Sequence, residues 1–415
     1  MRKIVIGGLV LGALVLAGCD DKSSGSGEAP AQSASATAAT VPAPSASAAA
    51  SPSASAKAEA PEKEKKAEGP KDHKSRVKAM EEAWASHDAK KVTALYAEDA
   101  VFKTPGMPDA KGRDAIEKHL TGMFAAFKDA KLTRGRVFEK DKHTVVVESL
   151  FTGTNTGDAP DMGIPKATNK PVGIMTASWY EIGDDGLIKE EHHFHDDPTF
   201  MGQLKEDKKN PVRPVFAALP DGSEHFEAKA EKEEAKKEDK KDDGKDSKAK
   251  KEEKKDDDSS KRAETEKKNV EAEDKMIADM NAGKIADSLK YLADDVSTTD
   301  YTQDKDLKGK KAFEAMIHGY LAAIPDMKVK GSGTFGDGKF VVQEFEYTGT
   351  QKGALGPIKP TNKPVDMHQL EIDEFKDGKI VKIWSWGNNM ELLSELGVTG
   401  DHEDKKEKHE KHEKK

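Results

Sequence analysis

The sequence has one cysteine, Cys19, in 415 residues. Without a second cysteine the chain can form no internal disulfide and no metal site built from several thiolates. Hydrophobic residues are also scarce, at 35%, and are matched by 35% charged residues, so much of the chain lies outside any packed core. The formal net charge of −9 argues against a nucleic-acid-binding protein.

The N-terminus has the pattern of an export signal. Arg2 and Lys3 precede an apolar run over residues 4–15, which is too short to span a bilayer comfortably. The run ends in LAGC, residues 16–19, and this ending resembles the lipobox of bacterial lipoproteins. The resemblance implies that residues 1–19 are a signal peptide and that acylated Cys19 anchors the protein to a membrane of the cell envelope, facing the periplasm or the outer surface. The alternative is an ordinary secretory signal.

Three segments are too biased in composition to fold. Residues 20–72 are rich in Ala, Ser and Pro, which predicts a disordered tether. Residues 207–262 form a predicted linker that is dense in Lys, Glu and Asp from about residue 228, where Glu–Lys pairs favour transient helix. Residues 400–415 form a charged tail with three histidines.

The remaining segments, residues 73–206 (copy 1) and 263–399 (copy 2), match each other. KATNKPV at 166–172 corresponds to KPTNKPV at 359–365, and KGRDAIEKHL from 111 corresponds to KGKKAFEAMI from 308. Two further pairs occur in the same order in both copies. FTGT of copy 1 corresponds to YTGT of copy 2, and ALYAEDAV of copy 1 corresponds to KYLADDV of copy 2. We interpret this as a domain duplication.

Each copy has amphipathic helical patterns first and alternating strand-like runs afterwards. An apolar stripe at helical spacing occurs in both copies, and Asp-Gly pairs at 185–186 and 377–378 separate the last two strand-like runs, as in a hairpin. This order predicts an α+β fold in which helices pack on a curved, mainly antiparallel sheet and leave a cone-shaped pocket. The residues of the stripe are Ile116, Leu120, Met123, Phe124 and Phe127 in copy 1 and Phe313, Ile317, Tyr320, Leu321 and Ile324 in copy 2.

These motifs, together with the ending WSWGNNMELLSELG, resemble the SnoaL-like polyketide cyclases of the nuclear transport factor 2-like superfamily. The resemblance covers nearly all of both copies and implies two tandem domains of that fold. The superfamily includes isomerases, cyclases and dehydratases as well as members that only bind or assemble, so the fold by itself leaves the chemistry open.

The catalytic residues that the resemblance implies are only partly present. The aspartate that serves as acid and base in SnoaL-like cyclases corresponds to His193 in copy 1 and Ser385 in copy 2. The base of ketosteroid isomerase corresponds to Asp300 in copy 2 and Thr104 in copy 1. Its tyrosine donor corresponds to methionine in both copies, so Asp300 would be a base without its aligned partner, or simply a loop carboxylate.

The stretch EEHHFHDD, residues 190–197, is the densest polar cluster in copy 1. Alternation along a strand, with the resemblance fixing the side, predicts Glu191, His193 and His195 toward the pocket. Four interpretations stay open: a metal site that would also need His119, a His193 base oriented by Glu191, a polar pocket for an anionic or hydroxylated ligand, and a solvated strand end. The same positions of copy 2, KIWSWGNN, predict a small and nearly neutral lining.

The sequence therefore predicts a lipid-anchored envelope protein that binds a small, partly apolar ligand or a partner protein without turnover. The alternative is a cyclase or isomerase acting on a ketone-containing substrate, with His193 or Asp300 as base. We expect no cofactor and no metal, no nucleic acid, and pairing of the two copies within one chain or a homo-oligomer. The predicted pocket residues are His119, His195, Trp179, Tyr320, Trp384 and Ser385.

Overall fold

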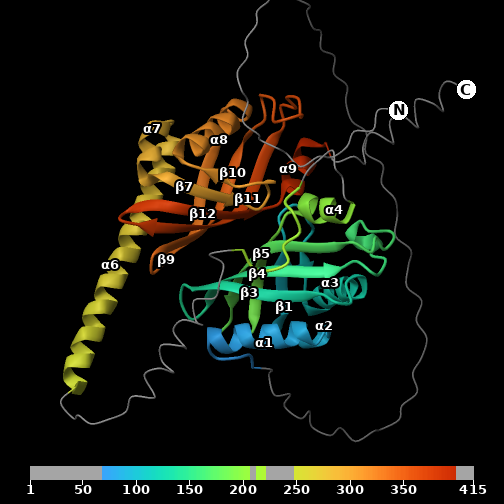
Figure 1. Cartoon of the computed structure of the whole chain (residues 1–415). Coiled ribbons are helices and arrows are strands. Elements are labelled where there is room, and N and C mark those ends of the chain that lie inside the picture. The colour runs from blue at the N-terminus through green and yellow to red at the C-terminus, as the bar shows by residue number, and fades with distance from the viewer. Residues whose placement is uncertain (1–67, 206–211, 221–246, 399–415) are drawn as a thin grey trace, which may run out of the picture. The chain divides into compact units, whose positions relative to one another are not determined.

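The computed structural model describes residues 68–205, 212–220 and 247–398. It contains two six-stranded sheets, one in each copy (Figure 1). The predicted signal peptide with Cys19, nearly all of the predicted tether, much of the predicted linker and the charged tail lie outside the described residues. Within the described residues, no helix is both long and apolar enough to cross a membrane.

The two copies contain matching elements in the same order. The elements of copy 1 are α1 (His73–Ala85), α2 (Ala89–Thr93), β1 (Tyr96–Lys103), β2 (Ala110–Lys111), α3 (Arg113–Ala126), β3 (Lys131–Glu139), β4 (Thr144–Thr154), η1 (Pro160–Met162), β5 (Pro171–Ile182), β6 (Ile188–Phe194) and α4 (Asp197–Lys205). The elements of copy 2 are α6 (Ser247–Asn281), α7 (Ile285–Ser288), η2 (Leu289–Tyr291), β7 (Leu292–Asp300), β8 (Leu307–Lys308), α8 (Lys310–Ala323), β9 (Lys328–Asp337), β10 (Phe340–Thr350), β11 (Pro364–Lys376), β12 (Lys379–Gly387) and α9 (Asn389–Leu396).

The sheets have the same topology. Their strand orders are β2-β1-β6-β5-β4-β3 and β8-β7-β12-β11-β10-β9. Only β1 with β6, and β7 with β12, run parallel, and the other neighbours are antiparallel. The predicted α+β fold with a mainly antiparallel sheet is confirmed, and so are the two hairpins at the Asp-Gly pairs.

The motifs that repeat between the copies fix turns. Gly112 and Gly309 precede α3 and α8 with φ of +84° and +83°, a conformation that favours glycine. The Asn of TNKPV, Asn169 or Asn362, has φ of 55° or 57°. In each copy a side chain at the end of β4 or β10 holds this turn, because Asn155 Oδ1 accepts from Thr168 N and Gln351 Oε1 accepts from Thr361 N.

The helices cover one face of each sheet, and this face holds the core. In copy 1, α1, α2 and α3 gather along one side of the sheet (Figure 1), and Val92, Ile116 and Phe127 are at most 1% exposed there. The opposite face of each sheet also carries buried aromatic side chains. They are Trp179 and Phe194 in copy 1 and Trp384 and Trp386 in copy 2.

The C-terminal part of the predicted linker is helical. Residues 247–262 are helical and continue into the first helix of copy 2, so α6 is 35 residues long. Glu–Lys pairs at i,i+4 spacing favour helix, and packing of the far end of α6 on β9 anchors it. Residues 212–220 run beside copy 1, where Phe216 N donates to Gly173 O at 3.0 Å.

Candidate functional site

Copy 1 holds a cavity of about 160 Å³ between its helices and the inner face of its sheet. A core cavity of roughly 150 Å³ accommodates one benzene-sized molecule, so the space suits a small ligand. Its wall is mainly apolar and aromatic, and its polar side chains are concentrated on β1, β5, β6 and the start of α4. The apolar wall includes Trp84, Phe102, Ile116, Leu120, Met123, Phe151, Ile174 and Phe200.

The polar side of this pocket comes from the stretch EEHHFHDD. Glu191, His193 and His195 line the pocket, as does Asp197, whereas Phe194 belongs to the cluster on the opposite face of the sheet. The alternation of strand β6 is the cause, since successive side chains point to opposite faces. The functional role of these residues stays a prediction.

A chain of hydrogen bonds orders the polar side chains. Tyr96 on β1 donates from its hydroxyl to Glu191 Oε2, and Glu191 is 3% exposed. Ser178 Oγ on β5 lies 2.8 Å from His193 Nδ1, and Glu191 Oε1 lies 3.6 Å from the same nitrogen. His193 therefore has a hydroxyl partner and a nearby carboxylate.

His195 is the least satisfied member of the group. Its Nε2 lies 3.1 Å from Asp197 Oδ1, but its buried Nδ1 has no hydrogen-bond partner within the described residues. Burial would lower the pKa of His195, but the charge and hydrogen bond of Asp197 outweigh it and raise the pKa. A protonated His195 would have a second N–H available for an acceptor on a ligand.

Two other histidines of the pocket favour the neutral form. Burial lowers the pKa of His193, and the charge of His195 adds to this, although Glu191 acts in the opposite direction. Burial also lowers the pKa of His119, with further lowering by His193 and His195. Phe102 lies between the two rings, with its ring centroid 5.6 Å from each. His119 thus lines the pocket without joining the hydrogen-bonded group.

The corresponding cavity in copy 2 measures about 90 Å³. Asp300, Tyr320 and Ser385 line it, and Ser385 pairs with Asp300 across the parallel β12/β7 ladder. Asp300 accepts hydrogen bonds from the amide and hydroxyl of Thr302, and burial raises its pKa. Five methionines, Met276, Met280, Met316, Met327 and Met367, supply much of the apolar wall.

The stretch KIWSWGNN contributes neutral side chains to this cavity, namely Ser385, Asn388 and Asn389, but other strands add charge. β7 brings Asp300 and β11 brings Glu371 to the cavity. The small residues of β12 alone suggested neutrality, but the neighbouring strands decide the charge.

The placement of two tryptophans also needs correction. Trp179 and Trp384 lie outside both cavities and are 4% and 2% exposed in the cluster on the opposite faces of the sheets. Trp179 is on the same strand as the pocket residues Ser178 and Tyr180, so alternation turns it away from them.

Several pocket residues were not foreseen from the sequence. Tyr96 and Tyr180 lie near Glu191, and burial together with the charge of Glu191 raises the pKa of both hydroxyls well above the ordinary value. In copy 2, Glu273, Glu371 and Asp373 come together from α6 and β11. The alternation of acids in LEIDEF, residues 370–375, was the available signal for the two residues on β11.

The comparisons with known proteins agree with the duplicated fold. Residues 77–191 match the model of the SnoaL-like domain, and residues 271–396 match that of the SnoaL-like polyketide cyclases. The chain therefore carries two tandem SnoaL-like domains. No curated protein matches the sequence.

Solved structures resemble one domain's length of the chain. AclR from Streptomyces galilaeus, a proposed hydroxylase, is 24% identical over 32% of this chain and 83% of its own, with a TM-score of 0.30. A proposed SnoaL-like polyketide cyclase from Jannaschia sp. is 16% identical over 32% and 94%, with a TM-score of 0.30. IdmH from Streptomyces antibioticus, a proposed polyketide cyclase, is 20% identical over 31% and 99%, with a TM-score of 0.29.

Proposed function

We propose that this chain is a lipid-anchored protein of the cell envelope whose copy 1 pocket binds a small, partly apolar ligand without turnover. The observation that carries the binding proposal is the pocket's division into an apolar wall and one ordered polar side. Such division is typical of small-molecule sites, where apolar contact supplies affinity and a few polar groups fix orientation. His195 Nδ1, which has no partner among the described residues, favours a ligand with a hydrogen-bond acceptor, such as a carbonyl or carboxylate.

The binding proposal is tested by native mass spectrometry of the purified full chain. The expected result is a small molecule that is retained by the wild type and lost from His195→Ala. Anilinonaphthalene sulfonate, an apolar anion, is the probe for protein that has lost its ligand. We expect His195→Ala to weaken its binding at least about 10-fold, which is the loss of one buried polar contact.

The matched control is His318→Ala on α8, because the His318 side chain is 59% exposed and lies in the other copy. Circular dichroism and thermal melting check that each variant folds. Equal probe affinity in the wild type and a folded His195→Ala variant would contradict a binding site at the polar side of this pocket.

The anchor rests on residues 1–19, which lie outside the described residues. The basic residues, short apolar run and LAGC ending support acylation of Cys19, and several acyl chains on one cysteine would give stable anchoring. Expression in a bacterium with labelled fatty acid tests the proposal. The wild-type protein is expected to carry the label and to be found in the membrane fraction, whereas Cys19→Ser is expected to carry no label. A wild-type chain without label would contradict acylation of Cys19.

We also propose that the two copies pair within one chain. Two corresponding hydrogen bonds support this, because Asn389 N donates to Asp196 Oδ1 at 2.9 Å and Asp197 N donates to Asn388 Oδ1 at 3.2 Å. Arg136 adds a contact, with its guanidinium carbon 3.7 Å from the centroid of the Trp384 ring.

Hydrogen exchange on the full chain tests the pairing. We expect Trp384→Ala to accelerate exchange in β3 and β4 of copy 1. Tyr291→Phe should leave those amides unchanged, because Tyr291 packs against the helix-side core of copy 2. Unchanged exchange in β3 and β4 for a folded Trp384→Ala variant would contradict pairing.

A second candidate function is acid–base catalysis in copy 1. The specific observation is that His193 faces the pocket with its pKa lowered by burial, so that it favours the neutral form that accepts a proton. Isomerisation of a ketone-containing substrate would then use His193 as base. Exchange of α-hydrogens of small ketones with deuterated water, followed by NMR, is the test. His193→Gln should abolish exchange if His193 is the base, and a wild type without exchange would favour binding alone.

A further inference from the structure

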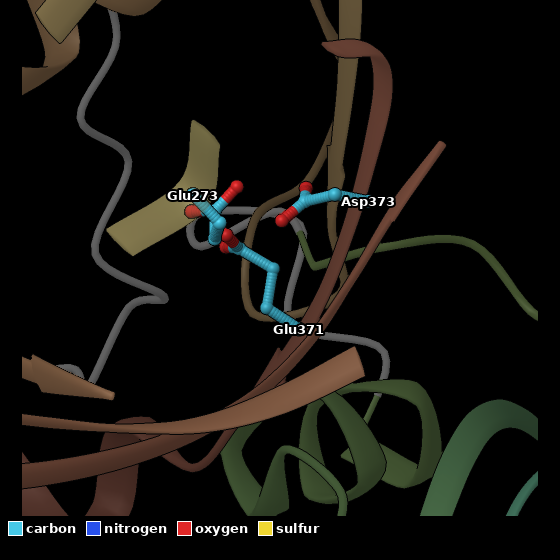
Figure 2. Close-up of side chains that lie close together, drawn as sticks. All are labelled: Glu273, Glu371 and Asp373. Carbon is cyan, nitrogen blue, oxygen red and sulfur yellow. The ribbon is translucent and has the colours of Figure 1, made fainter. Parts of the chain in front are cut away.

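Three carboxyl groups meet inside copy 2, away from the polar site of copy 1. One oxygen from each of Glu273, Glu371 and Asp373 lies within 4.8 Å of the others. Figure 2 shows Glu371 and Asp373 on one strand, β11, with their carboxyl groups turned toward that of Glu273 on α6. Because Glu371 and Asp373 are two residues apart on a strand, alternation places both side chains on the same face.

This cluster is buried, and no positively charged side chain is among the groups that act on its pKa values. Glu273 and Asp373 are 0% exposed, and none of their four carboxylate oxygens has a hydrogen-bond partner within the described residues. Burial of a carboxylate without a partner lowers the stability of the folded state by roughly several kcal/mol. Native proteins therefore neutralise such groups with a cation or with protons. Burial has the largest effect on all three carboxyl groups and raises the pKa of each. The charges of neighbouring acids raise these pKa values further, while the amide of Gln343 lowers that of Glu273 and a contact between Glu371 and Asp373 also acts on both groups. No lysine or arginine is among these influences.

A fourth polar group, Gln343 on β10, faces the cluster. Gln343 is 0% exposed, and it sits opposite Glu371 in the β10/β11 ladder. Its amide lies beside Glu273, yet its Nε2 has no hydrogen-bond partner of good geometry within the described residues. Rotation about the terminal bond would present the amide oxygen instead, so Gln343 can add a fourth oxygen ligand.

The duplication provides an internal comparison. The positions of Glu273, Gln343, Glu371 and Asp373 correspond in copy 1 to Val77, Val147, Ser178 and Tyr180. In copy 1, Val77, Val147 and Tyr180 belong to one hydrophobic cluster. The fold therefore forms with neutral residues at these positions, and packing alone does not require the acids of copy 2.

We propose that Glu273, Glu371 and Asp373 bind one divalent cation in copy 2. The donor set consists of oxygens only, with no histidine or cysteine, and this favours the hard cations Ca²⁺, Mn²⁺ and Mg²⁺ over Zn²⁺. Glu371 also lines the copy 2 cavity, which gives an ion a path to the two carboxylates behind it. A divalent ion would leave the three carboxylates with one net negative charge in place of three.

The experiment is calorimetric titration of the chelator-treated full chain with Ca²⁺, Mn²⁺ or Mg²⁺ alone, with thermal melting in parallel. We expect one ion per chain for at least one of these metals, together with a higher melting temperature. Glu273→Gln and Asp373→Asn, tested singly, should each weaken binding at least about 10-fold, since even outer partners of a metal site contribute 10- to 100-fold.

The matched control is Glu271→Gln, which removes one carboxylate from the same helix at a side chain that is 51% exposed. It should bind the ion as the wild type does. If a variant fails to fold, Glu371→Gln is the substitute, because Glu371 is only partly buried.

Two results would overturn the proposal. One is the absence of binding by all three metals at millimolar concentration. The other is binding that Glu273→Gln, Asp373→Asn and Glu371→Gln leave unchanged. If no ion binds and Glu371→Gln stabilises the metal-free protein at pH 7, shared protons and not a cation neutralise the cluster.

Discussion

Ser178 Oγ lies 2.8 Å from His193 Nδ1 in copy 1, and the two residues face each other across the β5/β6 ladder. The same ladder positions in copy 2 hold Glu371 and Ser385. One backbone arrangement thus presents a neutral hydroxyl with an imidazole in one pocket and a carboxyl with a hydroxyl in the other. A shared function of the two domains cannot depend on this pair of positions.

The first prediction concerns the ionisation of His193. Burial lowers its pKa, while the nearby carboxylate of Glu191 acts against this. Glu191→Gln should therefore lower the pKa of His193 further. Titration of the imidazole nitrogens by NMR measures it, and Glu190→Gln is the control, because Glu190 contacts His192 instead. A pKa of His193 that rises in Glu191→Gln would show that Glu191 does not stabilise the imidazolium.

The second prediction concerns the hydrogen bond from Tyr96 to Glu191. Tyr96→Phe leaves a buried carboxylate, 3% exposed, without its hydroxyl donor. The expected loss in free energy of unfolding is about 1–3 kcal/mol, measured by urea denaturation. The control is Tyr291→Phe, because the Tyr291 side chain in copy 2 is only partly buried. It should change the free energy of unfolding by less than about 0.5 kcal/mol. Equal values for the two variants would mean that the Tyr96 hydroxyl contributes nothing net.

The third prediction concerns the buried ion pair of Arg136 and Glu148. Both side chains are 0% exposed, with Nε to Oε2 at 2.7 Å and Nη2 to Oε1 at 3.1 Å. Glu148→Gln removes one charge and should cost about 3–5 kcal/mol, because the guanidinium stays buried without its counterion.

The control for this ion pair is Glu98→Gln, whose carboxylate pairs with Arg113 but is 86% exposed. Its expected cost is below about 1 kcal/mol. Chemical denaturation of both variants separates the two cases, and a cost for Glu148→Gln as small as that of the control would contradict a stabilising pair.

The fourth prediction is a pH dependence that rests on the proposed pairing of the two copies. His192 Nδ1 lies 2.7 Å from Glu344 Oε1, and its Nε2 lies 2.6 Å from Glu190 Oε1. Burial lowers the pKa of His192, but the two glutamates outweigh burial and raise the pKa above the ordinary value of 6.5. Protonated His192 therefore stabilises the fold fully at pH values below the pKa of His192 in the unfolded chain. This stabilisation is lost as the pH rises through the higher pKa of His192 in the folded protein.

His192→Gln measures this contribution. The variant should be about 1 kcal/mol less stable than the wild type at pH 5.5, and the difference should shrink toward pH 8.5. Urea denaturation at several pH values gives the difference. A gap that is constant with pH, or that grows as the pH rises, would contradict a charged bridge at His192.

The fold was largely predictable because its signals are local and occur twice. The apolar stripe of α3 at helical spacing and the Asp-Gly hairpins each depend on a few neighbouring residues. The helix at residues 247–262 was less predictable. Its charged composition indicated only transient helix, and the helix is anchored by packing of its far end against β9.

The candidate sites were predictable only where one strand supplies them. Alternation along β6 placed Glu191, His193 and His195 on one face, and the structure has them lining one pocket. Tyr96 and Ser178 come from other strands, and nothing in their local sequence indicated that they would contact Glu191 and His193.

The sequence by itself determined the duplication, the order of the elements and the alternation along each strand, because periodicity and turn chemistry act over short distances. Only the tertiary structure decided which face of a strand lines a pocket and which side chains from distant elements meet. Trp179 and Trp384 turned away from the pockets, and Glu273 reached Glu371 and Asp373 across about a hundred residues of chain. The charge of a pocket is the sum over all the strands and helices around it, so it becomes defined only when the sheet and its helices have packed.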